Sequence, residues 1–139
     1  MEMIAKNLKT TQKIAKKITK DLYGGDIILF LGDLGSGKTT FIKSIAKYLG
    51  VKDNVTSPTF NIVKQYNGRE FKLYHFDLYR IDDEKELEMI GVRDILNDEN
   101  SIIVVEWAEN APDYFDRGMK INIEKLDGKS RKFIIEDKE

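Results

Sequence analysis

The chain has 139 residues, of which 41% are hydrophobic and 34% charged, values typical of a globular protein with a buried core. The net charge is −1, without the basic excess of proteins held to nucleic acid by bulk charge, so we expect any contact with RNA to run through a partner. The absence of cysteine excludes disulfides and thiolate metal sites. The longest apolar run is too short to span a bilayer and no signal-peptide core opens the chain, so we predict a cytoplasmic protein.

The N-terminal part predicts a helix followed by a buried strand. The helix is expected over residues 11–22, because apolar residues recur every fourth position at Ile14, Ile18 and Leu22. Thr10 or Thr11 can cap its start, and Gly24-Gly25 can end it. The continuous apolar run Ile27–Leu31 predicts a strand buried on both faces, as in the middle of an α/β sheet.

The next segments predict a helix and a β-hairpin. After a glycine-rich loop, residues 39–49 carry an apolar helical face that Gly50 ends. Residues 60–66 and 71–79 are strand-like and are separated by Asn67-Gly68. This dipeptide is a strong hairpin signal, since both residues tolerate the positive φ of a type I′ turn.

The last third predicts two short helices, a buried strand and a second hairpin. Their expected ranges are 82–90, 92–96, 101–105 and, for the hairpin, 120–126 with 131–136. Asp82 or Asp83 can cap the first helix, and Asp127-Gly128 lies at the hairpin turn. No repeat or linker divides the chain, so we predict one α/β domain over residues 1–139 with a mixed sheet.

A phosphate-binding loop is the most specific motif of the chain. Gly32, Gly37, Lys38 and Thr39 satisfy the pattern G-x-x-x-x-G-K-[ST], between a buried strand and a helix as a P-loop requires. Backbone N–H groups and the helix N-terminus attract phosphate, Lys38 supplies a cation to the β- and γ-phosphates, and Thr39 offers a hydroxyl to Mg²⁺. The alternative is a glycine turn before a helix that happens to begin with Lys-Thr.

The motif therefore predicts a P-loop NTPase-like fold, a mixed sheet flanked by helices with antiparallel hairpin additions. We expect ATP and Mg²⁺ as its ligands, and the absence of an Asn-Lys-x-Asp motif favours ATP over GTP. The expected nucleotide-binding residues are Asp33, Gly35, Ser36, Gly37, Lys38, Thr39 and Thr40.

Two acidic residues are candidates to act with Lys38 in catalysis. Glu106 follows a buried apolar strand, and ligands of open α/β sheets bind beyond the carboxyl ends of such strands. Asp77 interrupts an apolar strand, where an acid is costly unless it is paired or binds a cation. Either acid can instead form a salt bridge with Arg80, Arg93 or a lysine. Spacing alone leaves open which acid touches the metal and which aligns water.

Three further features each have two interpretations. The hydroxyls of Ser57-Pro58-Thr59-Phe60 either sense the γ-phosphate as a switch segment does, or form a capping turn before a strand. His75 is the only histidine, and a lone histidine in a strand is more often a core residue than a catalyst. Trp107 either stacks on the nucleotide or fills the core.

Taken together, these motifs resemble the TsaE family, the bacterial ATPases of tRNA threonylcarbamoyladenosine synthesis. The matching segments follow the family order between residues 25 and 109. They are Gly32-Asp33-Leu34-Gly35-Ser36-Gly37-Lys38-Thr39-Thr40-Phe41, Ser57-Pro58-Thr59-Phe60, His75-Phe76-Asp77-Leu78-Tyr79-Arg80, Glu86-Leu87-Glu88, Gly91-Val92-Arg93-Asp94 and Val105-Glu106-Trp107. The P-loop is generic, whereas the Ser-Pro-Thr-Phe, His-x-Asp-x-Tyr-Arg and Glu-Trp segments are specific to the family. Ser36 stands where alanine is commoner in the family.

The resemblance implies a function that the residues alone do not. Members of the family bind ATP and Mg²⁺, hydrolyse ATP slowly when alone, and join TsaB and TsaD. TsaD transfers a threonylcarbamoyl group to the adenosine beside the anticodon of ANN-decoding tRNAs, and ATP hydrolysis supports repeated turnover. By the family pattern Thr39 and Glu106 would hold Mg²⁺, Asp77 would assist hydrolysis, and Trp107 would lie by the nucleotide. The Ser57 to Phe60 segment would be a switch region.

Two other functions compete with this interpretation. Many short P-loop chains are small-molecule kinases, which usually need an acceptor pocket and a lid that carries arginine. Here a predicted hairpin follows the P-loop helix and the arginines are few and scattered, which argues against a kinase. The third possibility is a nucleotide-gated binding module in which hydrolysis is incidental.

Overall fold

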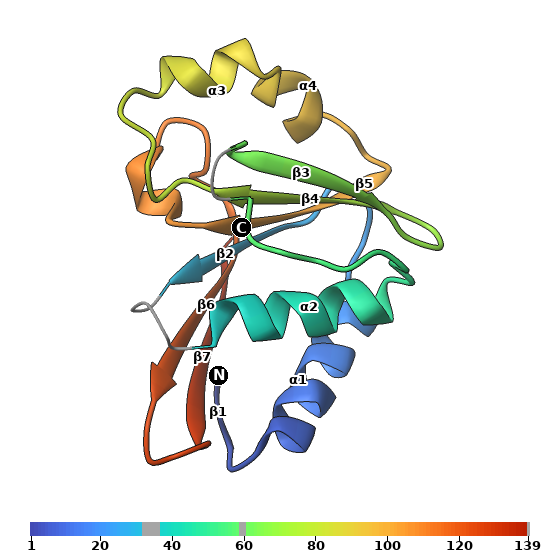
Figure 1. The fold of residues 1–139 in the computed structure, drawn as a ribbon, viewed down its shortest axis with the longest axis vertical. Helices are drawn as coiled ribbons and strands as arrows, with labels where there is room; N and C mark the ends of the chain where they lie inside the picture. Colours follow the sequence, from blue (N-terminus) through green and yellow to red (C-terminus); the bar gives the residue numbers. More distant parts are fainter. Residues whose placement is uncertain (32–36, 59–60, 139) are drawn as a thin grey trace.

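A seven-stranded mixed sheet forms the centre of the molecule (Figure 1). The computed structural model describes residues 1–31, 37–58 and 61–138. The strands are β1 Glu2–Ala5, β2 Ile27–Leu31, β3 Val63–Asn67, β4 Lys72–Asp77, β5 Ser101–Glu106, β6 Gly118–Lys125 and β7 Arg131–Lys138. The helices are α1 Leu8–Lys20, α2 Lys38–Tyr48, α3 Lys85–Met89, α4 Val92–Leu96 and the 3₁₀ helix η1 Ala108–Asn110. The predicted α/β class with a mixed sheet is confirmed.

The middle of the sheet is parallel and its outer strands are antiparallel. The strand order is β1-β7-β6-β2-β5-β4-β3, with β2 parallel to β5 and β6, and β4 parallel to β5. The hairpins β3–β4 and β6–β7 and the pair β1–β7 are antiparallel. Four parallel strands therefore end at one edge, which is the edge where ligands of such sheets bind.

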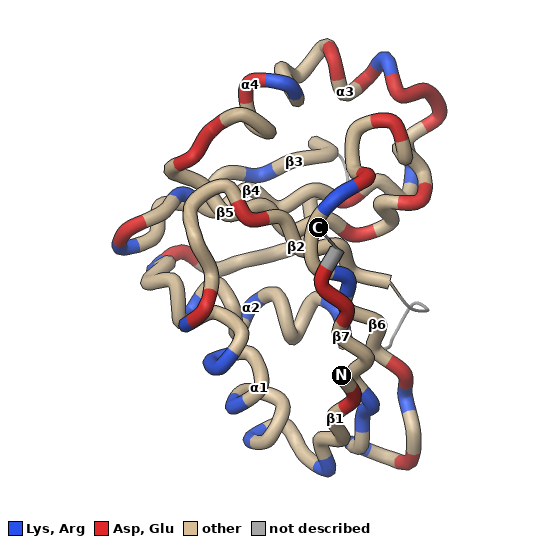
Figure 2. Tube along the Cα trace, turned by 180° about the vertical axis from the view of Figure 1, so that it is seen from behind, with Lys and Arg blue, Asp and Glu red and all other residues tan. Residues whose placement is uncertain are grey.

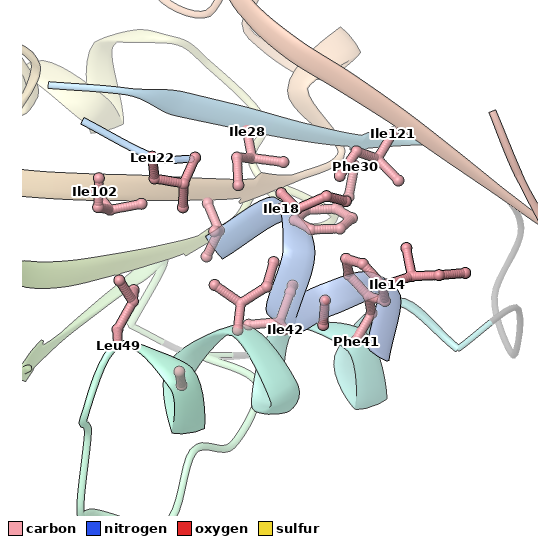
Figure 3. Packing of buried hydrophobic residues seen from close by; sticks show 14 of the residues in the cluster. Ile14, Ile18, Leu22, Ile28, Phe30, Phe41, Ile42, Leu49, Ile102 and Ile121 are labelled. Carbon is pink, nitrogen blue, oxygen red and sulfur yellow. The ribbon is translucent and has the colours of Figure 1, made fainter. Parts of the chain in front are cut away.

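Helices cover both faces of this sheet. Helices α1 and α2 pack on one face and α3 and α4 on the other, which agrees with the continuous apolar runs of β2 and β5. Figure 3 shows side chains of α1 and α2 directed towards those of β2 and β6. The labelled residues of this layer include Ile14, Ile18, Phe30, Phe41, Ile42 and Ile121.

Phe41 lies at the centre of this layer, and its removal is expected to be strongly destabilising. The side chain is fully buried, and its ring centroid lies 6.0 Å from that of Phe30 and 5.0 Å from that of Phe133. We expect Phe41→Ala to lower the free energy of unfolding by about 3–5 kcal/mol, measured by urea denaturation. Met89→Ala is the control, because the Met89 side chain is exposed on α3 and should change stability by less than about 0.5 kcal/mol. Equal losses in both variants would contradict the packing described here.

The N-terminal part differs from the prediction at both ends of its helix. Asn7, rather than Thr10 or Thr11, caps α1, because its Oδ1 accepts a hydrogen bond of 2.9 Å from the Thr10 N–H. The helix ends at Lys20, before Gly24-Gly25. The unpredicted strand β1 precedes it at the edge of the sheet, where only Ala5 is buried and a clear alternating pattern is therefore lacking.

The first hairpin is confirmed, but its turn is not the predicted one. Asn67 pairs with Lys72, so residues 68–71 form a longer connection, and neither Asn67 nor Gly68 has a positive φ. The turn is tied to the end of α2, because the Arg69 N–H donates to the Leu49 carbonyl over 2.8 Å. Glycine is required at position 68, since a Cβ there would lie 2.7 Å from that same carbonyl oxygen. Tertiary contact therefore overrides the local preference for a two-residue turn.

The remaining elements lie close to their predicted ranges. Helix α4, strand β5 and the second hairpin are confirmed. Strand β6 begins two residues before its predicted range and ends one residue before its end, and β7 ends two residues after its predicted range. The helix expected over 82–90 begins only at Lys85, because the N–H groups of Asp82 and Asp83 donate to Glu86 Oε2 instead of entering the helix. Glu84, rather than Asp82 or Asp83, is the N-cap residue, and it makes no capping hydrogen bond with its side chain, although Asp83 Oδ1 accepts from the Lys85 N–H.

Charge is distributed unevenly over the surface, which the net charge of −1 conceals. Helix α1 carries five exposed lysines and no acidic residue, whereas residues 82–88 contain five acidic residues and one lysine. Figure 2 shows the blue positions along α1 and the red positions near α3 on opposite parts of the trace. In the part of the chain that the structure describes, no helix is both long and apolar enough to cross a membrane.

Candidate nucleotide-binding site

The strand and the helix of the predicted P-loop occupy the expected positions. Strand β2 ends at Leu31, and α2 begins at Lys38 after Gly37. Gly37 has φ of 104°, a left-handed conformation that disfavours any residue with a Cβ. Thr39 is half-buried and Thr40 is exposed. The predicted nucleotide contacts of Asp33, Gly35 and Ser36 lie outside the described residues.

Lys38 is buried at the start of α2. Its side chain is only 5% exposed, and its Nζ lies 4.5 Å from the centroid of the Trp107 ring. A cation over an aromatic face is favourable, and the N-terminus of the helix adds the positive end of its dipole. Two sources of positive charge therefore meet where β2 leads into α2, as an anion-binding site requires.

The two candidate acids lie side by side at the carboxyl edge of the sheet. Asp77 is the last residue of β4 and Glu106 the last of β5, and the two are register partners in this parallel pair. Glu106 is also the register partner of Phe30 on β2, one residue before that strand ends. Strand pairing therefore places Glu106 next to the strand that leads to the P-loop sequence, and Asp77 one strand further away.

Asp77 is held by two hydrogen bonds from its own surroundings. The Ser57 hydroxyl donates to Oδ2 over 2.8 Å, and the Tyr79 N–H donates to Oδ1 over 3.1 Å. Ser57 thus contacts a candidate catalytic acid, whereas Thr59 and Phe60 of the same predicted switch segment lie outside the described residues. The alternative for Asp77 was a salt bridge to Arg80, Arg93 or a lysine, and the described contacts of its carboxylate are instead with a hydroxyl and an amide.

Glu106 is more deeply buried and has a histidine as its partner. Its residue exposure is 5%, that of His75 is 0%, and His75 Nε2 lies 2.8 Å from Glu106 Oε2. The sequence interpretation of His75 as a core residue missed this contact. The sequence did contain a positional signal. His75 and Asp77 are two residues apart on one strand and therefore share a face, and Glu106 ends the neighbouring parallel strand.

Two residues beside the acids have unusual backbone conformations. Trp107 has φ of 62° and follows Glu106 directly, and its ring lies 4.9 Å from that of Tyr79. Ile62 has φ of 66°, and its carbonyl accepts from the Asp77 N–H over 2.8 Å. Positive φ is rare for large side chains and is a true outlier for a β-branched one, and such strain gathers at functional sites. Both outliers adjoin the strand ends that carry the acids.

The oxygen donors at this edge fit Mg²⁺ bound together with a nucleotide. Within residues 1–31, 37–58 and 61–138, no group of three His, Cys, Asp or Glu side chains could hold a metal by itself. Mg²⁺ does not need such a group, because it usually binds one or two protein oxygens, several waters and substrate phosphates. The Thr39 hydroxyl at the start of α2 and the Glu106 carboxylate supply donors of that kind.

A buried strand that leads through glycine, lysine and threonine into a helix, beside acids on neighbouring parallel strands, defines a P-loop-like α/β protein. The model of one protein family, described as threonylcarbamoyl adenosine biosynthesis protein TsaE, matches residues 5–133. The chain therefore belongs to the TsaE family of threonylcarbamoyl adenosine biosynthesis proteins. The resemblance inferred from the motifs is confirmed.

Individual relatives agree with this assignment. The chain is 37% identical over 131 residues to the tRNA threonylcarbamoyladenosine biosynthesis protein TsaE of Rickettsia felis, covering 93% of this chain and 75% of that protein. It is 42% identical over 110 residues to the protein of the same name from Aquifex aeolicus, covering 78% and 77%. The crystal structure of Bacillus subtilis YdiB superposes with a TM-score of 0.77 at 30% identity, covering 96% of this chain and 82% of that one.

Proposed function

We propose that the chain is a cytoplasmic, Mg²⁺-dependent ATPase subunit required for threonylcarbamoyladenosine modification of tRNA. In this proposal it binds a complex of TsaB and TsaD, contacts tRNA only through that complex, and hydrolyses ATP to support its repeated turnover. Membership of the TsaE family supports the pathway. The observation that carries the ATPase activity is the position of Lys38 Nζ, 4.5 Å from the ring of the residue that follows Glu106. A phosphate-binding cation and a candidate metal ligand therefore share one end of the sheet.

Each side chain has a role that follows from its position. Lys38 and the first N–H groups of α2 bind the β- and γ-phosphates. Thr39 and Glu106 would hold Mg²⁺, which would offset the negative charge of the phosphates. Asp77, held by Ser57 and the Tyr79 amide, orients a water and accepts its proton as the bond to the γ-phosphorus forms. The products are ADP and inorganic phosphate. Trp107 is placed to contact the nucleotide beside Lys38.

The test is the release of inorganic phosphate from ATP, with and without TsaB and TsaD. We expect slow release by the chain alone and about tenfold or greater stimulation by the pair, since completion of a P-loop site by a partner can accelerate hydrolysis strongly. Lys38→Ala with the same partners is the control for contaminating ATPases. A parallel titration with GTP tests the preference for adenine.

Three other results of these assays would argue against a partner-activated ATPase. Absence of stimulation by TsaB and TsaD would contradict the partner-activated ATPase. Transfer of phosphate to a small metabolite would favour a kinase instead. Tight ATP binding with no hydrolysis under any condition would favour a nucleotide-gated binding module.

A further inference from the structure

The only histidine of the chain has no part in the mechanism proposed above, although it touches a candidate metal ligand. His75 lies on β4, two residues before Asp77, and is completely buried. Its Nε2 lies 2.8 Å from Oε2 of Glu106, which is 31 residues further along the chain. These two side chains are brought together by the pairing of β4 with β5.

The surroundings of the ring decide which nitrogen carries the hydrogen. Nδ1 of His75 is buried, and within the described part of the chain it has no hydrogen-bond partner. A hydrogen on Nδ1 would leave a buried donor unsatisfied and would direct the lone pair of Nε2 at a carboxylate oxygen. A hydrogen on Nε2 removes both penalties, because Nε2–H then donates to Glu106 Oε2. The contacts of the ring therefore favour the Nε2–H tautomer.

This hydrogen bond fixes the orientation of the carboxylate. Glu106 ends its strand at the carboxyl edge, and a glutamate side chain in general has several staggered rotamers. A donor bound to Oε2 selects one of them and leaves Oε1 as the oxygen that a cation can take. Partners of metal ligands commonly act in this way, and their loss weakens metal binding more than it changes the fold.

We propose that His75 is a positioning residue whose Nε2–H holds the Glu106 carboxylate so that Oε1 faces the Mg²⁺ of a bound nucleotide. The part that concerns Mg²⁺ rests on the proposed function, whereas the hydrogen bond does not. An alternative role, confined to stability, predicts that loss of His75 changes folding and leaves the metal requirement unchanged.

The first experiment observes the tautomer in the protein without nucleotide. Because the chain has one histidine, nitrogen NMR of protein labelled with ¹⁵N-histidine gives a single pair of ring signals. We expect a protonated nitrogen at Nε2 and an unprotonated one at Nδ1. A hydrogen on Nδ1 would overturn the proposal, whatever the protein does with ATP.

The second experiment compares two replacements of similar size. Gln carries an amide nitrogen that reaches roughly the position of His Nε2, whereas Leu has no donor. We expect His75→Leu to raise the Mg²⁺ concentration for half-maximal ATP binding about tenfold, and His75→Gln to raise it by less than about threefold. Calorimetry without Mg²⁺ should give an unchanged ATP affinity in both variants. Should His75→Leu not fold, His75→Asn replaces it, since the shorter amide does not reach Oε2.

Thr19→Val is the matched control, because it removes another buried hydrogen bond, of 2.7 Å to the Ala15 carbonyl, within α1 and outside the site. It should lose stability and keep the Mg²⁺ requirement of the wild type. A wild-type Mg²⁺ requirement in His75→Leu would overturn the positioning role and leave the proposed function intact. If the wild-type chain binds no ATP in the presence of Mg²⁺, both the positioning role of His75 and the proposed function are refuted. The NMR experiment would still show whether His75 donates a hydrogen bond to Glu106.

Discussion

Replacement of Lys38 by alanine is expected to weaken ATP binding about a hundredfold, which corresponds to about 3 kcal/mol. Lys38 is the first residue of α2, and its buried position makes its attraction for phosphate strong. The backbone N–H groups remain in the variant, so weak binding should persist. Calorimetric titration with ATP and Mg²⁺ measures the change.

Lys43→Ala is the matched control for this change. Lys43 lies on the same helix but is exposed, so its removal takes away an equal charge and should alter ATP affinity by less than about twofold. The fluorescence of Trp107, the only tryptophan, gives a second readout and should change when nucleotide binds. Unchanged affinity in Lys38→Ala would refute the phosphate site, and a flat fluorescence titration would contradict the placement of Trp107.

The centre of the fold could be predicted because its sequence signals are local and agree with one another. The apolar runs of β2 and β5 predicted strands buried on both faces, and each is covered by helices on both sides. The position of Glu106 at a strand end was predicted for the same reason, since the apolar run of the sequence stops at Val105. The function was predicted from the family motifs, because hydrophobic periodicity indicates helices and strands but not activity.

Other features depend on contacts between distant parts of the chain and carried no local signal. The adjacency of Asp77 and Glu106 follows from the order of strands in the sheet, and so does the contact of Glu106 with His75. The turn at Gly68 is decided by the carbonyl of Leu49, at the end of another element. The missed cap at Asn7 is a different case, because three residues near the helix start were all suitable caps and only the geometry selects one.

Replacement of Asp77 by asparagine is expected to separate catalysis from binding. The amide has the shape of the carboxylate and its oxygen can still accept a hydrogen bond, so ATP and Mg²⁺ should bind within about threefold of wild-type affinity. The amide cannot take a proton from water, so partner-stimulated phosphate release should fall by about a hundredfold or more. Glu106→Gln should instead raise the Mg²⁺ requirement about tenfold, because a neutral oxygen binds the cation less strongly. Phosphate release measured across a range of Mg²⁺ concentrations distinguishes the two effects.

This comparison decides a point that strand topology leaves open. As register partners, Asp77 and Glu106 reach the same edge, and either carboxylate could meet the metal. Their hydrogen bonds differ, since Glu106 has a buried ring nitrogen behind it, whereas Asp77 is held by a hydroxyl and an amide in a more open position. This difference is the reason why the proposed function gives the metal to Glu106 and the water to Asp77. A raised Mg²⁺ requirement in Asp77→Asn, with a normal one in Glu106→Gln, would reverse the assignment and leave His75 without a function at the metal.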